Sequence, residues 1–352
     1  MDSRERVETA LKHGEPDRTP VFEYVLQPPV ADAILGRKYV YGDRFAAYVH
    51  EHGWDKAVRQ TATDMVELAV RLKHDMIYAT PNLPPPSPEQ PSQTKQEEPP
   101  SDPVENLRLR VEHAEAAPYR APEESFFIYP CLRQAMKNFG VDLPLLAPAY
   151  SHGVWTDTAL MQTMVLEPEL VHRLFASRTK NTIALIDKYH GLGIEMLGVG
   201  GDFAGTRGPM ISPAAYRRFI MPEIRTLSRH IHSLDRYAIN ASDGNLWSLI
   251  EDFLTGCEVD GYIEIDFFAG MDLGRLKEQF GKNITFFGNL DCGNILSFGT
   301  VEQVKEHTKQ CLEKGMGSGG HILCASNAIT ASIPVKNYLA VYGAYRDFFS
   351  LD

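Results

Sequence analysis

The sequence has no apolar run that approaches the roughly 20 consecutive residues needed to span a membrane. Its opening segment, MDSRERVETALKHGEPDR, is charged and lacks the apolar centre of an export signal. These two absences predict a protein that neither sits in a membrane nor leaves the cell, so a cytoplasmic location is the default expectation.

Basic residues are also in short supply. Lys and Arg total 35 against 46 Asp and Glu, which gives a formal net charge of −11. Binding to nucleic acid depends on clustered Lys and Arg that neutralise phosphates, and no such cluster occurs in the chain. The composition therefore excludes nucleic acid as an expected partner.

Cysteine is sparse and scattered. The five cysteines include no CxxC pair, so the sequence predicts neither a disulfide framework nor a local metal-binding motif. The glycine-containing stretch GVGGDFAG also lacks the GxGxxG spacing of a dinucleotide site. Any metal site must be assembled from residues that lie far apart in the sequence.

The chain does contain short apolar runs that alternate with helical patterns, which is typical of parallel βα architecture. The helical stretches carry clear start signals, such as the capping-box pattern of Thr300 and Gln303. Eight runs favour a closed (β/α)8 TIM barrel, with a doubly wound sheet as the alternative. The expected strands are 20–25, 75–80, 146–153, 195–202, 236–243, 261–266, 284–291 and 320–327.

One segment interrupts this alternation. Residues 80–125 begin with a stretch dominated by Pro, Ser, Gln and Glu, which cannot bury a core. We expect a single barrel domain over residues 1–352 with a loop insertion at about 80–125. The insertion follows the second expected strand, so it would emerge on the C-terminal rim as a surface or disordered loop or as a mobile lid.

The carboxyl ends of barrel strands converge on one mouth, where distant residues can share a ligand. Glu264, Cys292 and Cys324 follow three successive expected strands. Two thiolates and a carboxylate can hold a catalytic zinc ion with one open position. The alternative is that the two cysteines simply pack in the interior, since free cysteine is among the most buried residue types.

Other strand ends supply further candidates. Asp202 and Asp243 could orient a substrate, and Asp243 could also be a fourth metal ligand, whereas a capping role for Asp202 and a turn or helix-start role for Asp243 are the alternatives. His152 lies beside aromatic residues that could form a substrate wall, or it is a hydrogen-bonded loop histidine. We assign catalytic roles to Asp202, Asp243 and His152, and substrate contacts to Tyr24, Tyr150, Trp155 and Asn289.

Several stretches carry a family resemblance. SRERVETALKHGEPDRTPV, DFAGTRGPMISPAAYRRFIMP, SDGNLWSLIEDF, AGMDLGRLKEQFGKNITFFGNLDC and GGHILCASNAI occur in this order and resemble the uroporphyrinogen decarboxylase superfamily. The resemblance covers nearly the whole chain apart from residues 80–125. It implies a (β/α) barrel.

The resemblance also implies a choice between two branches. Decarboxylases of the superfamily carry an arginine-rich motif after the first strand, where this chain reads FEYVLQPPV without arginine. Thiol-methylating members bind zinc through a His-x-Cys pair, where this chain has Ala241 and Asp243, and through a strand-eight cysteine that Cys324 matches. The chain therefore resembles the corrinoid-linked methyltransferase branch better, with its zinc ligands shifted to Glu264, Cys292 and Cys324.

These observations lead to one main hypothesis. The chain is expected to be a zinc-dependent methyltransferase that moves a methyl group between a small methylated substrate, such as an aryl methyl ether, and a corrinoid (cobalamin) carried by a partner protein. The alternatives are a decarboxylase acting on a smaller acid and a non-catalytic subunit that binds the corrinoid protein.

Overall fold

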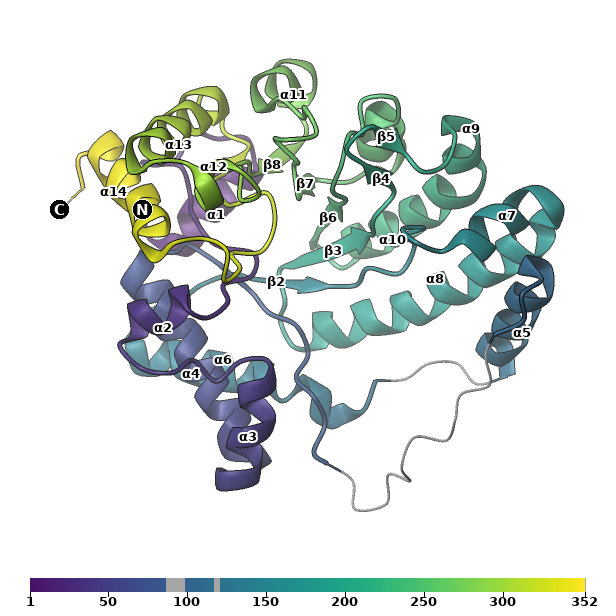
Figure 1. The fold of residues 1–352 in the computed structure, drawn as a ribbon, viewed down its shortest axis with the longest axis horizontal. Coiled ribbons are helices and arrows are strands. Elements are labelled where there is room, and N and C mark those ends of the chain that lie inside the picture. Colours follow the sequence, from purple (N-terminus) through teal and green to yellow (C-terminus); the bar gives the residue numbers. More distant parts are fainter. Residues whose placement is uncertain (87–98, 117–120, 352) are drawn as a thin grey trace.

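The computed structural model of the chain describes residues 1–86, 99–116 and 121–351. Seven parallel strands form one curved sheet in the order β1-β2-β3-β6-β7-β8-β9, and β4 and β5 form a separate antiparallel hairpin (Figure 1). The strands are β1 (Ile77–Tyr78), β2 (Leu145–Pro148), β3 (Met196–Gly200), β4 (Ala204–Gly205), β5 (Gly208–Pro209), β6 (Tyr237–Ala241), β7 (Gly261–Ile263), β8 (Thr285–Phe287) and β9 (His321–Ile322).

The first expected strand closes this sheet into a barrel. Val21 forms a parallel bridge with Leu323, next to β9. On its other side, the backbone N–H of Asp75 donates to the carbonyl of Val21 at 2.7 Å. All eight expected strands thus take part in the wall, and the predicted barrel is confirmed over the doubly wound alternative.

Helices surround this wall (Figure 1). In the described residues the α-helices are α1 (Ser3–Leu11), α2 (Val30–Leu35), α3 (Asp43–His52), α4 (Trp54–Leu72), α5 (Pro103–Ala116), α6 (Ile128–Phe139), α7 (Thr158–Leu166), α8 (Pro168–Gly191), α9 (Pro213–Ala215), α10 (Met221–Ser233), α11 (Leu273–Phe280), α12 (Ile295–Phe298), α13 (Val301–Gly315) and α14 (Val335–Phe349). A 3-10 segment, η1 (Glu123–Phe126), and two π-helical segments, η2 (Tyr216–Ile220) and η3 (Asp252–Gly256), complete the set.

Helix α1 plugs the amino end of the barrel. Its Val7, Ala10 and Leu11 are buried in the same apolar cluster as the inward-facing strand residues Phe22 and Met196. The backbone N–H of Gly320, just before β9, also donates to the carbonyl of Ala10. Because this end is filled, a ligand can reach the barrel interior only from the carboxyl end or through the wall.

Successive side chains along each strand point alternately into the barrel and toward the outer helices, as the two-residue period of a β-strand requires. In β9 and the residues directly after it, Ile322 and Cys324 point into the barrel, while Leu323 and Ala325 pack against the outer helices. In the first expected strand, residues 20–25, which we call the first stave, Phe22 and Tyr24 belong to the inner apolar cluster and Val21 belongs to the outer one. This alternation decides which candidate residues can face a substrate inside the barrel.

The insertion at 80–125 is not a loop throughout. Residues 103–116 form α5, whose Leu107 and Val111 are fully buried and which packs against α7 and α8. The prediction missed this helix because the proline-rich stretch before it dominates the composition of the segment. The remaining part of the predicted loop at 87–98 and 117–120 lies outside the described residues.

None of the helices that the structure describes combines the length and the apolar character needed to cross a membrane.

Candidate functional site

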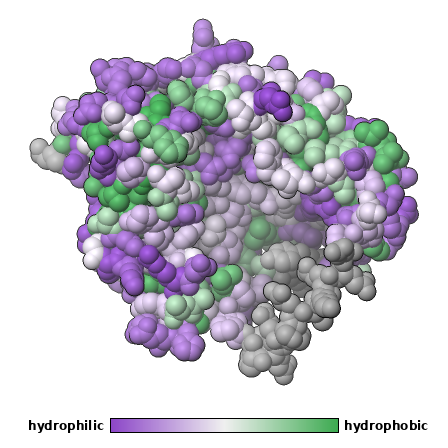
Figure 2. All heavy atoms as spheres, in the orientation of Figure 1, coloured by the Kyte–Doolittle hydropathy of each residue, from purple (hydrophilic) through white to green (hydrophobic). Residues whose placement is uncertain are grey.

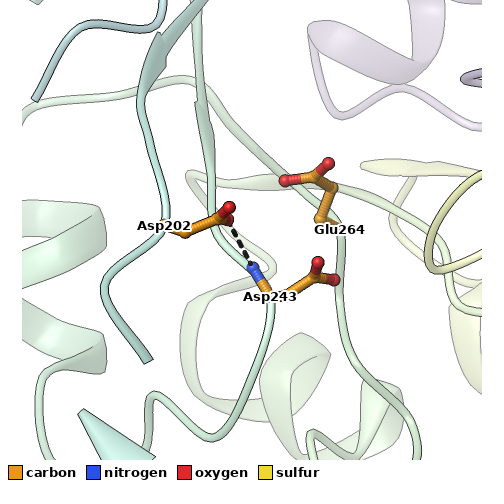
Figure 3. Close-up of side chains that lie close together, drawn as sticks. All are labelled: Asp202, Asp243 and Glu264. Carbon is orange, nitrogen blue, oxygen red and sulfur yellow. Dashed lines mark hydrogen bonds between the residues drawn. The ribbon is translucent and has the colours of Figure 1, made fainter. Parts of the chain in front are cut away.

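Three carboxylates meet at the carboxyl end of the barrel. Asp202 follows β3, Asp243 follows β6 and Glu264 follows β7, which are neighbouring strands in the sheet. Each offers an oxygen that lies within 4.8 Å of the others, and Figure 3 shows the three side chains converging on one space. We call Asp202, Asp243 and Glu264 the carboxylate cluster.

Burial and mutual repulsion raise the proton affinity of this cluster. The pKa of Asp243 rises to about 7, mainly because it is buried and then because Asp202 and Asp266 lie nearby. The pKa of Glu264 rises to about 9 through burial and the charges of Asp243 and Asp202. Within the described ranges, no Lys or Arg forms an ion pair with any of the three.

A divalent cation fits this environment. Buried carboxylates that repel one another either hold protons or share a cation, and three oxygen donors form part of a first coordination shell for Zn²⁺, Mn²⁺ or Mg²⁺. Glu264 has a left-handed backbone with φ of 69°, which is uncommon for a residue with a side chain and is frequent at functional sites.

Hydrogen bonds fix the position of the aspartates. The side-chain amide of Asn327, beyond β9, donates to Oδ2 of Asp243 at 2.7 Å. The backbone N–H of Asp243 donates a long hydrogen bond of 3.5 Å to Oδ1 of Asp202 (Figure 3). The cluster is therefore held in place by contacts that do not depend on a bound ion.

Tyrosines line the barrel beside the cluster. The rings of Tyr24 and Tyr78 are 4.3 Å apart between centroids, and their hydroxyl oxygens are 3.4 Å apart. Burial raises the pKa of Tyr24, Tyr78 and Tyr150, and the charge of Glu264 contributes to each rise. The structure thus brings the predicted residues Tyr24 and Tyr150 near the cluster and adds Tyr78.

A glycine in β3 makes room for Tyr150. A Cβ atom at Gly198 would lie 2.5 Å from the ring of Tyr150. Such a separation is far inside van der Waals contact, so any larger residue at 198 would push this ring away.

The predicted metal ligands are only partly brought together. Cys324 is fully buried in the barrel interior, and Cys292 is half-buried in the outer layer, with Sγ 3.4 Å from the Ser326 hydroxyl. Among the described residues, the group that meets the distance criterion for a shared metal contains Glu264 with the two aspartates and neither cysteine. Of the three predicted ligands, Glu264 is the one that belongs to this group, and Cys292 lies in the turn after Leu290, where its thiol contacts Ser326.

His152 lies away from the cluster. Its side chain is fully buried, with Nε2 2.9 Å from the Thr179 hydroxyl of α8 and Nδ1 2.9 Å from the hydroxyl of Ser151. Thr179 in turn donates to Glu223 of α10. Burial lowers the pKa of His152 to about 3, so it is neutral and joins the barrel wall to two outer helices, contrary to the predicted catalytic role.

Asn289 is also directed outwards. Its side-chain amide donates to the carbonyl of Met271 at 2.9 Å, and its oxygen accepts from the thiol of Cys311 on α13. Both polar ends are thus occupied in the layer between β8 and the helices, contrary to the predicted substrate contact. Trp155 lies on the loop after β2, is 49% exposed, and faces Gly205 of the β4–β5 hairpin.

The sequence model described as uroporphyrinogen decarboxylase (URO-D) matches residues 152–348, which is more than half of the chain. The chain belongs to the uroporphyrinogen decarboxylase family. The matched range contains the whole carboxylate cluster and strands β3 to β9.

Individual relatives come from two kinds of enzyme. A uroporphyrinogen decarboxylase of Syntrophotalea carbinolica is 25% identical over 179 residues, 51% of this chain and 49% of that protein. A methylated-thiol–coenzyme M methyltransferase of Methanosarcina mazei is 22% identical over 193 residues, 55% of this chain and 47% of that protein. These matches span about half the length of the curated relatives, so they support an enzyme of this family without fixing the reaction.

A solved structure confirms the fold over the full length. A methyltransferase from Methanosarcina mazei superposes with a TM-score of 0.69 at 16% identity, covering 99% of both chains. The predicted barrel of the uroporphyrinogen decarboxylase type is therefore confirmed by a family match and by a structural match.

Two features of the site were missing from the sequence interpretation. Tyr78 was not singled out, although the alternation in DMIYAT places Met76 and Tyr78 on the same face of a strand. Asp243 was considered as a metal ligand beside Glu264, but Asp202 was expected only to orient a substrate, because the point that all three share depends on how the barrel closes.

Proposed function

We propose that the chain is a methyltransferase that binds a divalent cation at the carboxylate cluster and transfers a methyl group between a small methylated substrate and the corrinoid of a partner protein. The observation that carries this proposal is the convergence of Asp202, Asp243 and Glu264 in a buried site where no basic residue of the described chain pairs with them. Family membership and the named methyltransferase relative support the reaction class.

The donor set changes the expected metal chemistry. The proposed donor set is three carboxylates instead of the Glu264, Cys292 and Cys324 set expected from the sequence, so Zn²⁺, Mn²⁺ and Mg²⁺ are all candidates. A cation bound there would supply Lewis-acid stabilisation of negative charge on an oxygen of the substrate.

The chain's own groups prepare the site. Asn327 holds the carboxylate of Asp243 in one orientation, and the tyrosines exclude water from the side of the cluster that faces the barrel interior. The corrinoid of the partner protein would supply the electron pair that displaces the methyl group, and the methyl–oxygen bond of the substrate would break as the methyl group is transferred. With a cation bound, Glu264 would be deprotonated, and the departing oxygen would leave as an anion that the cation stabilises and that takes its proton from water.

A second candidate function rests on the same raised pKa values. A decarboxylase needs an acid that protonates the carbanion left by loss of carbon dioxide, and Glu264 holds a proton at neutral pH. This reaction would need no cation. Metal content therefore separates the two candidates.

The test combines metal analysis with a transfer assay. Purified protein is dialysed against Zn²⁺, Mn²⁺ or Mg²⁺, bound metal is measured, and methylation of a cobalt(I) corrinoid protein by methoxybenzene is followed by absorption. We expect about one cation per chain, and both binding and transfer to be lost in Asp243→Asn and Glu264→Gln. Asp266→Asn is the matched control, because Asp266 lies near Asp243 but outside the cluster, and Asn keeps the oxygen that accepts from the Ala269 N–H.

Three results would count against the proposal. Metal-free protein that releases carbon dioxide from a small acid would establish the decarboxylase. Tight association with a corrinoid protein and no transfer from any methoxyarene would establish a non-catalytic binding subunit. Cation binding that survives in both cluster variants would place the metal elsewhere.

A further inference from the structure

A pocket of about 220 Å³ lies beside the barrel wall, next to the carboxylate cluster but outside it. Its walls come from the first stave, from β1 and the residues after it, from the connection between α2 and α3, and from α4. Tyr41 and Phe45 at its edge are half-buried, and Gly42 and Thr80 are exposed, so the pocket opens to solvent. Figure 2 shows that this side of the molecule is hollowed near the centre of the view.

The pocket lies at a gap in the barrel wall between the first stave and β1, and we call this gap the seam. The Asp75 N–H bonds to the Val21 carbonyl, but beyond it no backbone hydrogen bond joins the first stave to β1 among the described residues. The rings of Tyr24 and Tyr78 fill the gap, and both residues line the pocket. The same two tyrosines lie close enough to Glu264 for its charge to raise their pKa values. The seam thus connects the pocket to the cluster through one layer of aromatic side chains.

The lining is aromatic and apolar and carries no basic side chain. Tyr39 and Tyr41 are stacked with centroids 5.3 Å apart, beside Phe45 and Met65. No Lys or Arg occurs among the described residues that line the pocket. An anion placed there would lose part of its hydration without gaining a Lys or Arg partner, which disfavours its binding.

Apart from its tyrosines, the lining contains two ionisable groups, and both already have protein partners. Glu23 accepts from the backbone N–H of Ala325, and burial raises its pKa to about 8, so it is uncharged at neutral pH. Nε2 of His74 lies 2.6 Å from the Tyr342 hydroxyl, and burial lowers its pKa to about 3. Both groups are neutral at pH 7, and the pocket as a whole suits an uncharged flat ligand. A cavity of about 150 Å³ is enough to hold benzene.

We infer that this pocket binds the ring of a neutral aromatic substrate against Tyr24 and Tyr78, that the substrate reaches the carboxylate cluster when these two rings turn out of the seam between the first stave and β1, and that the mouth of the barrel is left to the second reactant. The inference rests on the proposed methyl transfer and adds to it the substrate class and the route of entry. A separate lateral route lets both reactants be bound at the same time.

Calorimetric titration tests the inference without any turnover. The probes are methoxybenzene, which is neutral, and methoxybenzoate, which has the same ether and an added carboxylate. We expect methoxybenzoate to bind at least about tenfold more weakly, because its charge finds no partner in the pocket. Equal affinity for the two probes would overturn the neutral substrate class.

Two variants that fill the pocket locate the binding site. Thr61→Met and Ala69→Met add side-chain volume from α4 into the pocket, and each should weaken methoxybenzene binding by at least about tenfold. Thr63→Met is the matched control on the same helix. Thr63 is half-buried like Thr61, donates to the carbonyl four residues earlier as Thr61 does, and does not line the pocket. Thermal unfolding identifies which variants are folded. If Thr61→Met does not fold, the binding measured for Ala69→Met provides the test.

The outcomes separate this inference from the proposed function. Unchanged methoxybenzene binding in both folded pocket variants would overturn the lateral site even if methyl transfer is observed. Binding that the pocket variants abolish, combined with no methyl transfer in the wild-type protein, would leave the site standing as a neutral-arene site and remove the proposed reaction.

Discussion

The side-chain amide of Asn327 donates to Oδ2 of Asp243 at 2.7 Å and so joins the segment after β9 to the end of β6. The strands β7 and β8 lie between these two in the sheet, so the hydrogen bond spans the mouth of the barrel. It stabilises the charged form of Asp243 and thereby opposes the burial and the neighbouring carboxylates that raise its pKa to about 7.

Removing this hydrogen bond should weaken cation binding. In Asn327→Leu the pKa of Asp243 rises further. A larger fraction of the molecules then carries a proton on Asp243 at neutral pH, and a cation must displace that proton to bind. A hydrogen bond to a charged group contributes about 1.5–3 kcal/mol, and we expect affinity at pH 7 to fall at least about tenfold. Titration at pH 7 and pH 9 checks this, and a loss of the same size at both pH values would contradict the proton-competition account.

The stability of the metal-free protein should decrease with rising pH. The pKa values of Asp243 and Glu264 are raised to about 7 and about 9 in the folded state. A group with a raised folded pKa contributes stability that is complete below its unfolded pKa, near 4, and is lost as the pH rises through the folded value. We therefore expect the unfolding temperature to fall between pH 5 and pH 9 without metal. Chemical denaturation across this range measures the loss.

Variants and metal provide the controls for that pH profile. The double change Asp243→Asn with Glu264→Gln should flatten it, since neither replacement titrates. Added cation should also flatten it, because the cation stabilises the charged carboxylates of the folded state only. A profile with the same slope in the double variant would assign the pH dependence to other groups, such as Glu23.

Adding a single methyl group at Gly198, which lies against the ring of Tyr150, should lower the stability of the fold. Gly198→Ala places a Cβ atom 2.5 Å from the Tyr150 ring and should destabilise the fold by about 1–3 kcal/mol. The matched control is Gly343→Ala in α14, where a Cβ meets nothing within 4 Å and should stabilise the helix by about 0.5–1 kcal/mol. Denaturant unfolding gives both values, and equal stability of the two variants would show that the Tyr150 ring can move freely.

Replacing His152 should affect stability and leave the cluster intact. His152→Ala leaves the Thr179 hydroxyl without its ring partner, at a cost of about 1–3 kcal/mol. Bound cation per chain should not change in the folded variant, because His152 contacts α8 instead of the cluster. Full stability together with lost cation binding would restore the catalytic role that the sequence had suggested.

The sequence determined the architecture because local patterns carry it. Short apolar strands, alternating helices and the capping box of Thr300 and Gln303 depend on near neighbours in the chain, and the structure contains each of them. The composition of residues 80–125 predicted a loop and so missed α5, whose buried residues Leu107 and Val111 follow a proline-rich stretch.

Only the tertiary structure decided the composition of the site. Cys292 and Cys324 follow expected strands as plausible ligands, but among the described residues neither belongs to the group of side chains that lie close enough to share a metal ion. Asp202, Asp243 and Glu264 meet because three neighbouring strands end at the same height, and the pocket beside them exists because the first stave and β1 diverge after one hydrogen bond. Such contacts join residues far apart in the chain, and no local pattern in the sequence records them.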